Sequence, residues 1–475
     1  MTKAFFLLLL AATAAAASVV KTEVSGNSVH FKLSDGEARL DWLSPVAFSW
    51  YRVPAGVSIP DAQSREGIAF TPAEQDGWLQ YATRYIRVEV SRLDTHLRVY
   101  SASGQLLRDD QSKPAERRWG SDEGFVLSAL GYGEFRTNTT PPERRFYYGP
   151  SLKEVLEQHM LANGQPDGLG PEVVDVLRPS QRPRESSPPL NVNANSWDAL
   201  RDVVRRLLNA SMEAVLYPSV DLALFSGPAQ ARAEQLATFL PIVLDSRSEP
   251  SRMAARDPWK PYLVTYFREA RDRGFPIIRP LMLQFPRDPQ SPAVDDEFLL
   301  GDELLVAPVI SEQKTRTAYL PMGYWTDLRT NIEYKGRQSV SVEVTPSAIP
   351  VFARNGSLLP IASKRGLELH YFPKLGSEFF LWEPEVSDIS QFHANPILGD
   401  ILRFESEARI GRDCEWIAHH YAAPKSVKDA SSAYTKVAER RLLRPGTWFH
   451  DSEHNNLHVM SRAEPNGDEI INVYY

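Results

Sequence analysis

The sequence predicts a multidomain protein of the α+β class, with an N-terminal β-sandwich, an incomplete (β/α) barrel-like segment and a C-terminal β-sandwich region. Three observations support this prediction. The 475 residues are enough for two to four domains. Apolar and polar residues alternate over residues 19 to about 135, with Gly-containing turn signals at hairpin spacing. Helical periodicity begins only after Gly149-Pro150, and β patterning returns near residue 291.

The overall composition argues against several kinds of partner and site. The chain has 53 Lys and Arg against 60 Asp and Glu, a net charge of -7, and no long basic run, so nucleic acid is not expected as a partner. Cys414 is the single cysteine, which excludes an intrachain disulfide and a multi-cysteine metal site. Phosphate-loop and dinucleotide fingerprints are missing from the sequence, so we expect no cofactor.

Residues 1–18 have the pattern of a secretory signal peptide. Lys3 precedes an apolar run, and an Ala-rich segment ends near Ala17. The run is short for a membrane span, so an uncleaved anchor is the less favoured interpretation. We therefore expect an exported protein, secreted or periplasmic, that has no membrane segment after cleavage.

Helices and strands alternate in the segment 149–290. Ser151 and Glu154 form a capping box before the first predicted helix. A Pro-rich stretch then leads to a second helix over residues 196–212, which has an apolar stripe of five residues: Leu200, Val203, Val204, Leu207 and Leu208. A short strand pattern follows, and then helices are predicted at 228–240 and at about 259–273.

Three stretches together resemble one enzyme family. Residues 145–158 read RFYYGPSLKEVLEQ, residues 274–310 begin GFPIIRPLMLQFPRDP, and residues 319–361 contain YLPMGYWTDLRT and IPVFARNGSLLPI. Their sequence and order resemble glycoside hydrolase family 31, which contains α-glucosidases and α-xylosidases. The resemblance implies a galactose-mutarotase-like sandwich over 19–148, a curtailed barrel over 149–290 and a C-terminal sandwich over 291–364. Residues 365–475 remain a mixed region of unknown role.

The resemblance also implies two catalytic carboxylates, and neither is found. The family cleaves α-glycosidic bonds with retention, by means of a nucleophile and a general acid/base. Val192 occupies the expected acid/base position, before Ser196 and Trp197, and valine carries no exchangeable proton. No Asp-Met-Asn-Glu type of nucleophile motif occurs, and residues 149–290 are fewer than the roughly 200 that a full (β/α)8 barrel needs. We therefore expect no catalytic residue.

The sugar-contacting motifs are altered as well. The family's Asp-Ile-Gly-Gly-Phe corresponds to residues 221–225, where Asp221 and Phe225 remain and both glycines are replaced. Its Arg-Asn-His corresponds to Leu244, Asp245 and Ser246. The candidate substrate-binding residues are Asp221, Phe225 and Trp197, and local hydrogen bonding to backbone is the favoured role of Asp221.

Other acidic and histidine clusters carry weaker signals. Asp295, Asp296 and Glu297 are expected to form a solvated acidic loop rather than a catalytic pair. Two His/acid clusters lack a recognised ligand spacing, so no metal site is predicted there; they comprise Asp413, Glu415, His419 and His420, and then His450, Asp451, Glu453 and His454.

The expected function is therefore that of a degenerate family 31 member whose hydrolysis of α-glycosidic bonds is impaired, with an α-linked carbohydrate as the ligand. The main alternative is a non-catalytic carbohydrate-binding or partner-binding protein, with Trp325 and Trp382 as aromatic platforms. Two further alternatives are a remnant that lacks an internal segment and a barrel completed by a partner chain. The sequence predicts neither the sugar nor the oligomeric state.

Overall fold

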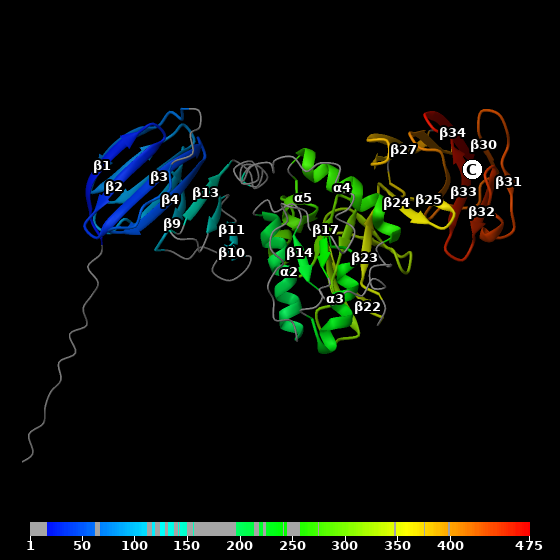
Figure 1. The fold of residues 1–475 in the computed structure, drawn as a ribbon, viewed down its shortest axis with the longest axis horizontal. Helices are drawn as coiled ribbons and strands as arrows, with labels where there is room; N and C mark the ends of the chain where they lie inside the picture. The colour runs from blue at the N-terminus through cyan, green and yellow to red at the C-terminus, as the bar shows by residue number, and fades with distance from the viewer. Residues whose placement is uncertain are drawn as a thin grey trace, which may run out of the picture. The chain divides into compact units, whose positions relative to one another are not determined.

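The computed structural model describes residues 17–61, 67–111, 116–118, 124–128, 132–136, 141, 143–149, 155, 196–212, 218–221, 225–240, 242–244, 257–273, 275–345, 348–374, 376–397 and 400–475. The chain divides into two compact units, Met1–Gln158 and His159–Tyr475 (Figure 1). The expected signal peptide lies outside the described residues, apart from Ala17 and Ser18. None of the helices described here is long and apolar enough to span a membrane.

Two β-sheets build the first unit. The larger has the order β1-β2-β3-β4-β13-β12-β11-β10, and the smaller runs β5 to β9 in sequence. The strands are β1 Val19–Ser25, β2 Ser28–Leu33, β3 Gly36–Ser44, β4 Ala47–Pro54, β5 Thr71–Gln75, β6 Trp78–Ala82, β7 Ile86–Ser91, β8 Leu97–Ser101, β9 Leu106–Asp109, β10 Glu116–Arg118, β11 Gly124–Ser128, β12 Tyr132–Arg136 and β13 Glu143–Tyr148. All the pairings are antiparallel, as the alternating pattern predicts.

The two sheets of the first unit share one hydrophobic core. Phe31 of β2 packs against Tyr81 of β6 with ring centroids 5.8 Å apart, so the aromatic rings of the two sheets meet. The cluster also contains Trp42, Trp50 and Val88, all buried. Because successive residues of a strand face opposite sides, each sheet contributes alternate residues to this core and turns the others outward. This arrangement is a β-sandwich.

Helices and short strands build the first part of the second unit. Residue 155, which still belongs to the first unit, is helical and buried, and the remainder of the first predicted helix lies outside the described residues. The next three predicted helices are confirmed, as α2 Trp197–Met212, α3 Gln230–Ala237 and α4 Lys260–Arg273. The predicted stripe of α2 is its buried face, because all five of its apolar residues are inaccessible to solvent.

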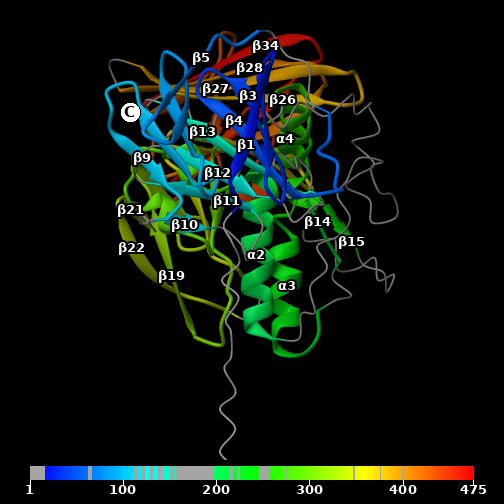
Figure 2. The ribbon, with the colours of Figure 1, turned by 90° about the vertical axis from the view of Figure 1, so that its left-hand side faces the viewer.

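One βαβ unit is described in this part of the chain (Figure 2). Strand β14, Ser219–Asp221, pairs in parallel with β15, Ile242–Leu244, and a short helix η3, Gly227–Ala229, and α3 connect them. Within the described residues of 149–290, β14 and β15 form a separate two-stranded sheet. A closed barrel is therefore not observed in the described part, and the barrel remnant stays a prediction.

A set of short antiparallel strands follows. The sheet has the order β16-β17-β18-β23-β20-β21, and β19 pairs with β22. Its core includes Leu299, Trp325 and Phe352. The elements are β16 Ile278–Arg279, α5 Leu281–Gln284, η5 Ser291–Ala293, β17 Phe298–Leu300, β18 Leu304–Val306, β19 Thr315–Leu320, β20 Tyr324–Asp327, β21 Glu333–Lys335, β22 Gln338–Glu343 and β23 Val351–Arg354.

The tail is far more regular than its sequence suggests. It forms two sheets, of order β24-β25-β29-β33-β32-β31 and β26-β27-β28-β34-β30. The description of residues 365–475 as a mixed region was therefore wrong. The elements are β24 Ser357–Ser363, β25 Gly366–Phe372, β26 Ser377–Glu383, β27 Asp388–Ile397, β28 Ile401–Ala408, β29 Arg412–Ala418, β30 Ser426–Lys428, β31 Thr435–Lys436, η6 Arg440–Leu442, β32 Thr447–Asp451, β33 Asn456–Ala463 and β34 Gly467–Tyr474.

Helix α4 lies against the edge strand of the second tail sheet. Strand β26 is at the edge of this sheet, and β27 is its one sheet neighbour among the described strands. The backbone N–H of Trp382 donates instead to Oγ1 of Thr265 at 3.0 Å. Tyr262 of α4 also stacks on Phe379 of β26, with ring centroids 5.9 Å apart. The helix therefore covers a strand edge that would otherwise expose unpaired backbone groups.

Candidate functional site

The ends of β14 and β15 form the expected location of a catalytic centre. In βαβ architecture, sites form at the carboxyl ends of parallel strands. The strand register pairs Asp221 with Leu244, and each is the last residue of its strand. The two motifs that the family resemblance predicted to contact the sugar thus come together at one edge. Val192 lies outside the described residues, as does the side chain of Asp221.

The two aromatic candidates have different surroundings. Phe225 is buried, with 2% of its surface exposed, so it packs in the interior. Trp197 opens α2 and is partly buried; its indole Nε1–H donates to Oε1 of Glu312 at 3.2 Å. The hydroxyl of Ser196 accepts a hydrogen bond from the backbone N–H of Ala199, as a helix cap does. The contact with Glu312 links the start of α2 to the loop before β19.

The acidic cluster 295–297 is structural, and the expected solvated loop is wrong for Glu297. This residue is 1% exposed, and its Oε1 accepts the backbone N–H of Tyr319 at 2.9 Å. Burial raises the pKa of Glu297 to about 8, although Arg316 opposes that shift. Asp295 pairs with Arg205. Asp295 and Asp296 directly precede Glu297 and are acidic as well, so the sequence pattern could not show that Glu297 is the buried one of the three.

Glu303 is a second carboxyl group inside a hydrogen-bond network, which the sequence did not single out; it is partly buried. Its Oε2 lies 2.8 Å from the hydroxyl of Tyr262 and 2.5 Å from that of Tyr266. The Tyr262 hydroxyl also lies 2.6 Å from the carbonyl of Leu300. A hydroxyl carries one proton, so protonation of Glu303 would let the carboxyl group donate the second of these two bonds. Consistent with this, burial raises the pKa of Glu303 to about 7.

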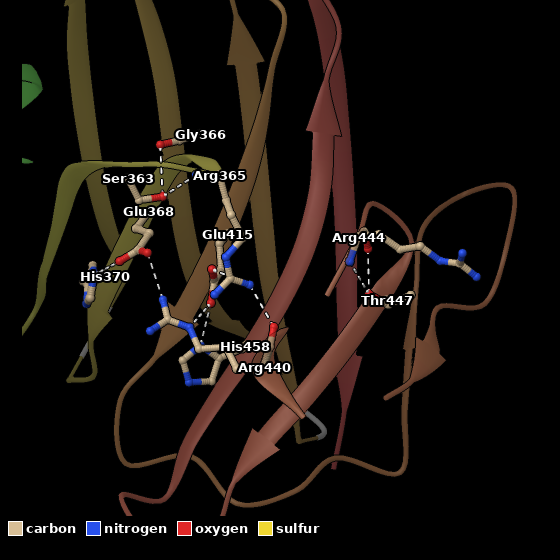
Figure 3. Close-up of polar contacts among 10 residues, drawn as sticks. All are labelled: Ser363, Arg365, Gly366, Glu368, His370, Glu415, Arg440, Arg444, Thr447 and His458. Atoms are coloured by element: carbon tan, nitrogen blue, oxygen red, sulfur yellow. Dashed lines mark hydrogen bonds and ion pairs between the residues drawn. The ribbon is translucent and has the colours of Figure 1, made fainter. Parts of the chain in front are cut away.

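Two carboxylates of the tail stand side by side, in a geometry that superficially suits catalysis. Glu368 of β25 is paired with Glu415 of the parallel strand β29. Figure 3 shows the guanidinium of Arg440 between them, with Nε 2.7 Å from Oε1 of Glu415 and Nη2 2.9 Å from Oε1 of Glu368. His458 donates Nδ1–H to the same Oε1 of Glu415 at 2.8 Å.

The charges in this cluster exclude an acid/base pair. Burial alone would raise the pKa of Glu415, but the hydrogen bonds from His458 and Arg440 outweigh it and hold the pKa at about 2. The pKa of Glu368 is also lowered, because His370 and Arg440 outweigh the effect of its burial. Both groups are therefore ionised at neutral pH, and neither has a proton to give to a leaving group.

The histidine clusters hold turns and strands together. His419 is bonded through Nε2 to Nδ1 of His370 at 3.0 Å and through Nδ1 to Oδ1 of Asn331 at 2.8 Å. Asp451 accepts a hydrogen bond from Nδ1 of His454. It also accepts one from the backbone N–H of Glu453, so its carboxylate stabilises the turn between β32 and β33. Among the residues that the structure describes, no group of three His, Cys, Asp or Glu side chains is placed to hold a metal ion.

The two tryptophans considered as platforms differ sharply. Trp325 is completely buried, and its Nε1–H donates to the carbonyl of Pro321, so it cannot serve as a platform. Trp382 is only partly buried and lines a cavity beside α4.

Comparison with known proteins identifies a family and several relatives. Residues 274–359 match the model of the glycosyl hydrolase family 31 C-terminal domain. Alpha-glucosidase 2 of Bacillus thermoamyloliquefaciens is 28% identical over 201 residues, which are 37% of this chain and 26% of that protein. Mouse neutral alpha-glucosidase C is 29% identical over 297 residues, 56% of this chain and 32% of that protein. The chain thus spans about a quarter to a third of these two relatives.

The fold also matches a solved structure of the same family. A Flavobacterium johnsoniae family 31 dextranase, complexed with isomaltotriose, superposes with a TM-score of 0.68 at 14% identity. The match covers 97% of this chain and 100% of the dextranase chain. At this identity, the likeness concerns the fold alone.

Proposed function

This chain belongs to glycoside hydrolase family 31, and we propose that it is a catalytically impaired member that retains an α-linked carbohydrate as its ligand. Retaining hydrolysis needs two carboxyl groups about 5–5.5 Å apart, one as nucleophile and the other as acid/base. The proposal is that the chain supplies neither group at the ends of its barrel-like strands.

The pairing of Asp221 with Leu244 carries the proposal. It supports the alignment of both motifs with the family pattern, because it joins them at neighbouring strand ends. In that alignment, Leu244 stands where the family has an arginine that contacts sugar hydroxyls. An isobutyl side chain offers no hydrogen bond to a sugar. The same alignment places Val192 at the acid/base position.

The acidic clusters described above supply no evident substitute. Glu297 is buried, Glu303 is partly buried, and both are hydrogen-bonded within the protein. Glu368 and Glu415 are joined through Arg440. A catalytic carboxyl group must reach the substrate, and these four are engaged in holding the fold.

Turnover of aryl glycosides and covalent labelling together test the proposal. We expect p-nitrophenyl α-glucoside and α-xyloside to be hydrolysed at no more than background rate. We also expect no mass increase of the intact protein after incubation with 5-fluoro-α-glucosyl fluoride, which traps the nucleophile of retaining enzymes. An active family 31 α-glucosidase serves as the positive control. A labelled Asp or Glu, or turnover comparable to that control, would refute the proposal.

We further propose that residues 1–18 direct export of the chain, on the basis of their charge and apolar pattern. N-terminal sequencing of the protein recovered outside the cytoplasm tests this. A mature N-terminus near residue 18 is expected, and an intact Met1 on exported protein would contradict cleavage.

A further inference from the structure

Two histidines of the first tail sheet belong to a chain of hydrogen bonds. His370 lies on β25, and His419 follows the end of β29. Nε2 of His370 lies 3.2 Å from Oε2 of Glu368, a contact that Figure 3 shows. Its Nδ1 lies 3.0 Å from Nε2 of His419, whose Nδ1 lies 2.8 Å from Oδ1 of Asn331. Asn331 belongs to the turn between β20 and β21, so the chain joins the tail to the sheet that precedes it.

Both ends of this chain accept hydrogen bonds. Burial would raise the pKa of Glu368, but its charged partners outweigh that effect and lower the pKa, so the carboxylate is ionised at neutral pH. The amide of Asn331 is oriented by its Nδ2, which donates to the carbonyl of His454 at 2.8 Å and to Oδ1 of Asn456 at 3.1 Å. Its Oδ1 therefore faces His419, and this atom can only accept.

The number of protons on the histidine pair, His370 and His419, follows from this arrangement. Three hydrogen bonds between two terminal acceptors need three N–H groups, whereas two neutral imidazole rings carry only two. One ring is therefore an imidazolium. His419 is buried and stacks on Phe372, with ring centroids 4.2 Å apart. Burial, and then the charge of His370, hold the pKa of His419 well below its ordinary value, so the additional proton resides on His370. Nε2 of His419 is thus an unprotonated acceptor.

The surroundings of His419 oppose its protonation. Within the described residues its polar side-chain contacts are with His370 and Asn331, so a carboxylate is not among them. His420 and His458 lower its pKa further. The charged groups on the neighbouring elements are bonded to other residues; they are Glu333, Glu368, Glu415 and Arg440. A proton added to His419 would therefore meet no compensating charge.

We propose that the histidine pair holds the tail to the β20–β21 turn at neutral pH and releases that turn in mildly acidic solution. A fourth proton would convert Nε2 of His419 from an acceptor into a donor. Two N–H groups and two positive charges would then face each other at 3.0 Å, which favours separation. Loss of the third proton in alkaline solution removes only the contact between His370 and Glu368, because His370 can keep its proton on Nδ1. The release is therefore confined to acid.

The direction of this response follows from proton linkage. In the closed state, His419 binds a proton more weakly than a histidine in water, whose pKa is about 6.5. The open state therefore takes up a proton as the pH falls below that value, and the closed state is fully favoured above it. Uptake of one proton on opening raises the opening equilibrium constant by up to about tenfold for each pH unit.

Hydrogen exchange of the full-length protein, followed by mass spectrometry and corrected for intrinsic rates, tests the release. The backbone N–H of Asn331, bonded to the carbonyl of Asp327 at 2.8 Å, lies in the turn that should open. Below about pH 6.5, the opening constant of this turn should rise by up to about tenfold per pH unit, whereas that of α2 should stay constant. An unchanged opening constant of the turn, or an equal rise in α2, would overturn the proposal.

Three variants separate the histidine pair from other acid effects. His419→Gln removes the titrating group and should abolish the response. His370→Gln removes the positive charge that opposes protonation of His419, so the rise should level off at a higher pH; this variant serves if the first does not fold. His393→Gln is the matched control, because His393 lies on β27 and pairs with Glu378, and it should respond as the wild type does. An identical response in the wild type and in both variants of the pair would overturn the proposal.

NMR of the ring nitrogens, in full-length protein labelled on histidine, tests the proton positions independently. At neutral pH we expect His419 to carry a proton on Nδ1 alone and His370 to carry protons on both nitrogens. Each signal is assigned by its absence from the corresponding Gln variant. A proton on Nε2 of His419, or a neutral His370, would overturn the proposal.

Discussion

Arg440 and Glu415 form a hydrogen-bonded ion pair in which the guanidinium Nε lies 2.7 Å from a carboxylate that is only 1% exposed. Arg440 belongs to the short helix η6, whereas Glu415 lies in the middle of β29. The guanidinium Nη1 of Arg365, in the turn between β24 and β25, also donates to the carbonyl of Arg440 at 2.8 Å. The pair therefore fastens the segment before β32 onto the first tail sheet.

Removal of the Arg440 guanidinium should destabilise the tail. We expect Arg440→Ala to lower the free energy of unfolding by about 1–3 kcal/mol, because a buried carboxylate loses a charged hydrogen-bond partner. Its neighbour Arg441 is 77% exposed and pairs with Glu439, so Arg441→Ala should change stability by less than about 0.5 kcal/mol. Urea denaturation followed by tryptophan fluorescence measures both variants, and equal effects would contradict this role of Arg440.

Acid should weaken the same cluster. The pKa of Glu415 in the folded protein is about 2, below its usual value of 4.5. The resulting stabilisation is complete above pH 4.5 and is lost as the pH falls towards 2; it amounts to at most about 3 kcal/mol. Glu415→Gln should therefore be less stable than the wild type at pH 7 and approach it near pH 2. Unfolding curves recorded between pH 2 and 7 would contradict this if the difference stayed constant.

Glu303 should behave in the opposite way. Because its folded-state pKa is raised from 4.5 to about 7, the folded chain is favoured while the group is protonated. Stability should fall as the pH rises from about 4.5 through 7, by at most about 3 kcal/mol. Glu303→Gln, which stays neutral, should remove this decline and be more stable than the wild type at pH 8. Glu464→Gln, at a 72% exposed side chain, is the control and should leave the slope unchanged.

The apolar face of α2 should be sensitive to truncation. Leu207 is completely buried, so Leu207→Ala should cost about 2–5 kcal/mol from lost contacts and the cavity left behind. The preceding Arg206 is about half exposed and pairs with Asp202 one turn away. Arg206→Ala should cost less than about 0.5 kcal/mol. Thermal unfolding by circular dichroism compares the two, and a small effect of Leu207→Ala would mean that α2 is not packed as described.

A carboxylate introduced at position 192 should not restore hydrolysis. Val192→Asp replaces only the acid/base, and retention still requires a nucleophile that the alignment does not supply. We expect turnover of p-nitrophenyl α-glucoside to stay at background, and Val192→Asn is the uncharged control. A rise of a hundredfold or more in the aspartate variant alone would show that a nucleophile is present after all.

Periodicity made the helices predictable. The spacing of the five apolar residues in α2 matches its buried face, and Ser196 is its cap, because both signals are local in sequence. The pairing of Asp221 with Leu244 also agrees with the motif alignment, although each strand has only three residues.

The tail was not predictable in the same way, because polar residues stand on its inward face. Strand β28 alternates as expected, but two of its inward residues are Ser406 and Ala408, which weaken the apolar signal. Strand β33 contains buried His458 and Ser461. Buried polar residues are tolerated when they form hydrogen bonds, and here the partners lie on other strands. His458 of β33 and Glu415 of β29 are one such pair, 43 residues apart in sequence, so a local sequence pattern cannot reveal it.

The hydrogen bond from the Trp382 backbone to Thr265 has a consequence for dividing the chain into fragments. A tail expressed without α4, beginning after residue 273, would keep both of its sheets but uncover β26 along its free edge. An exposed edge strand can pair with the edge strand of another molecule, so such a fragment would tend to self-associate. The smallest autonomous piece of this region therefore starts before Lys260, well upstream of the first tail strand.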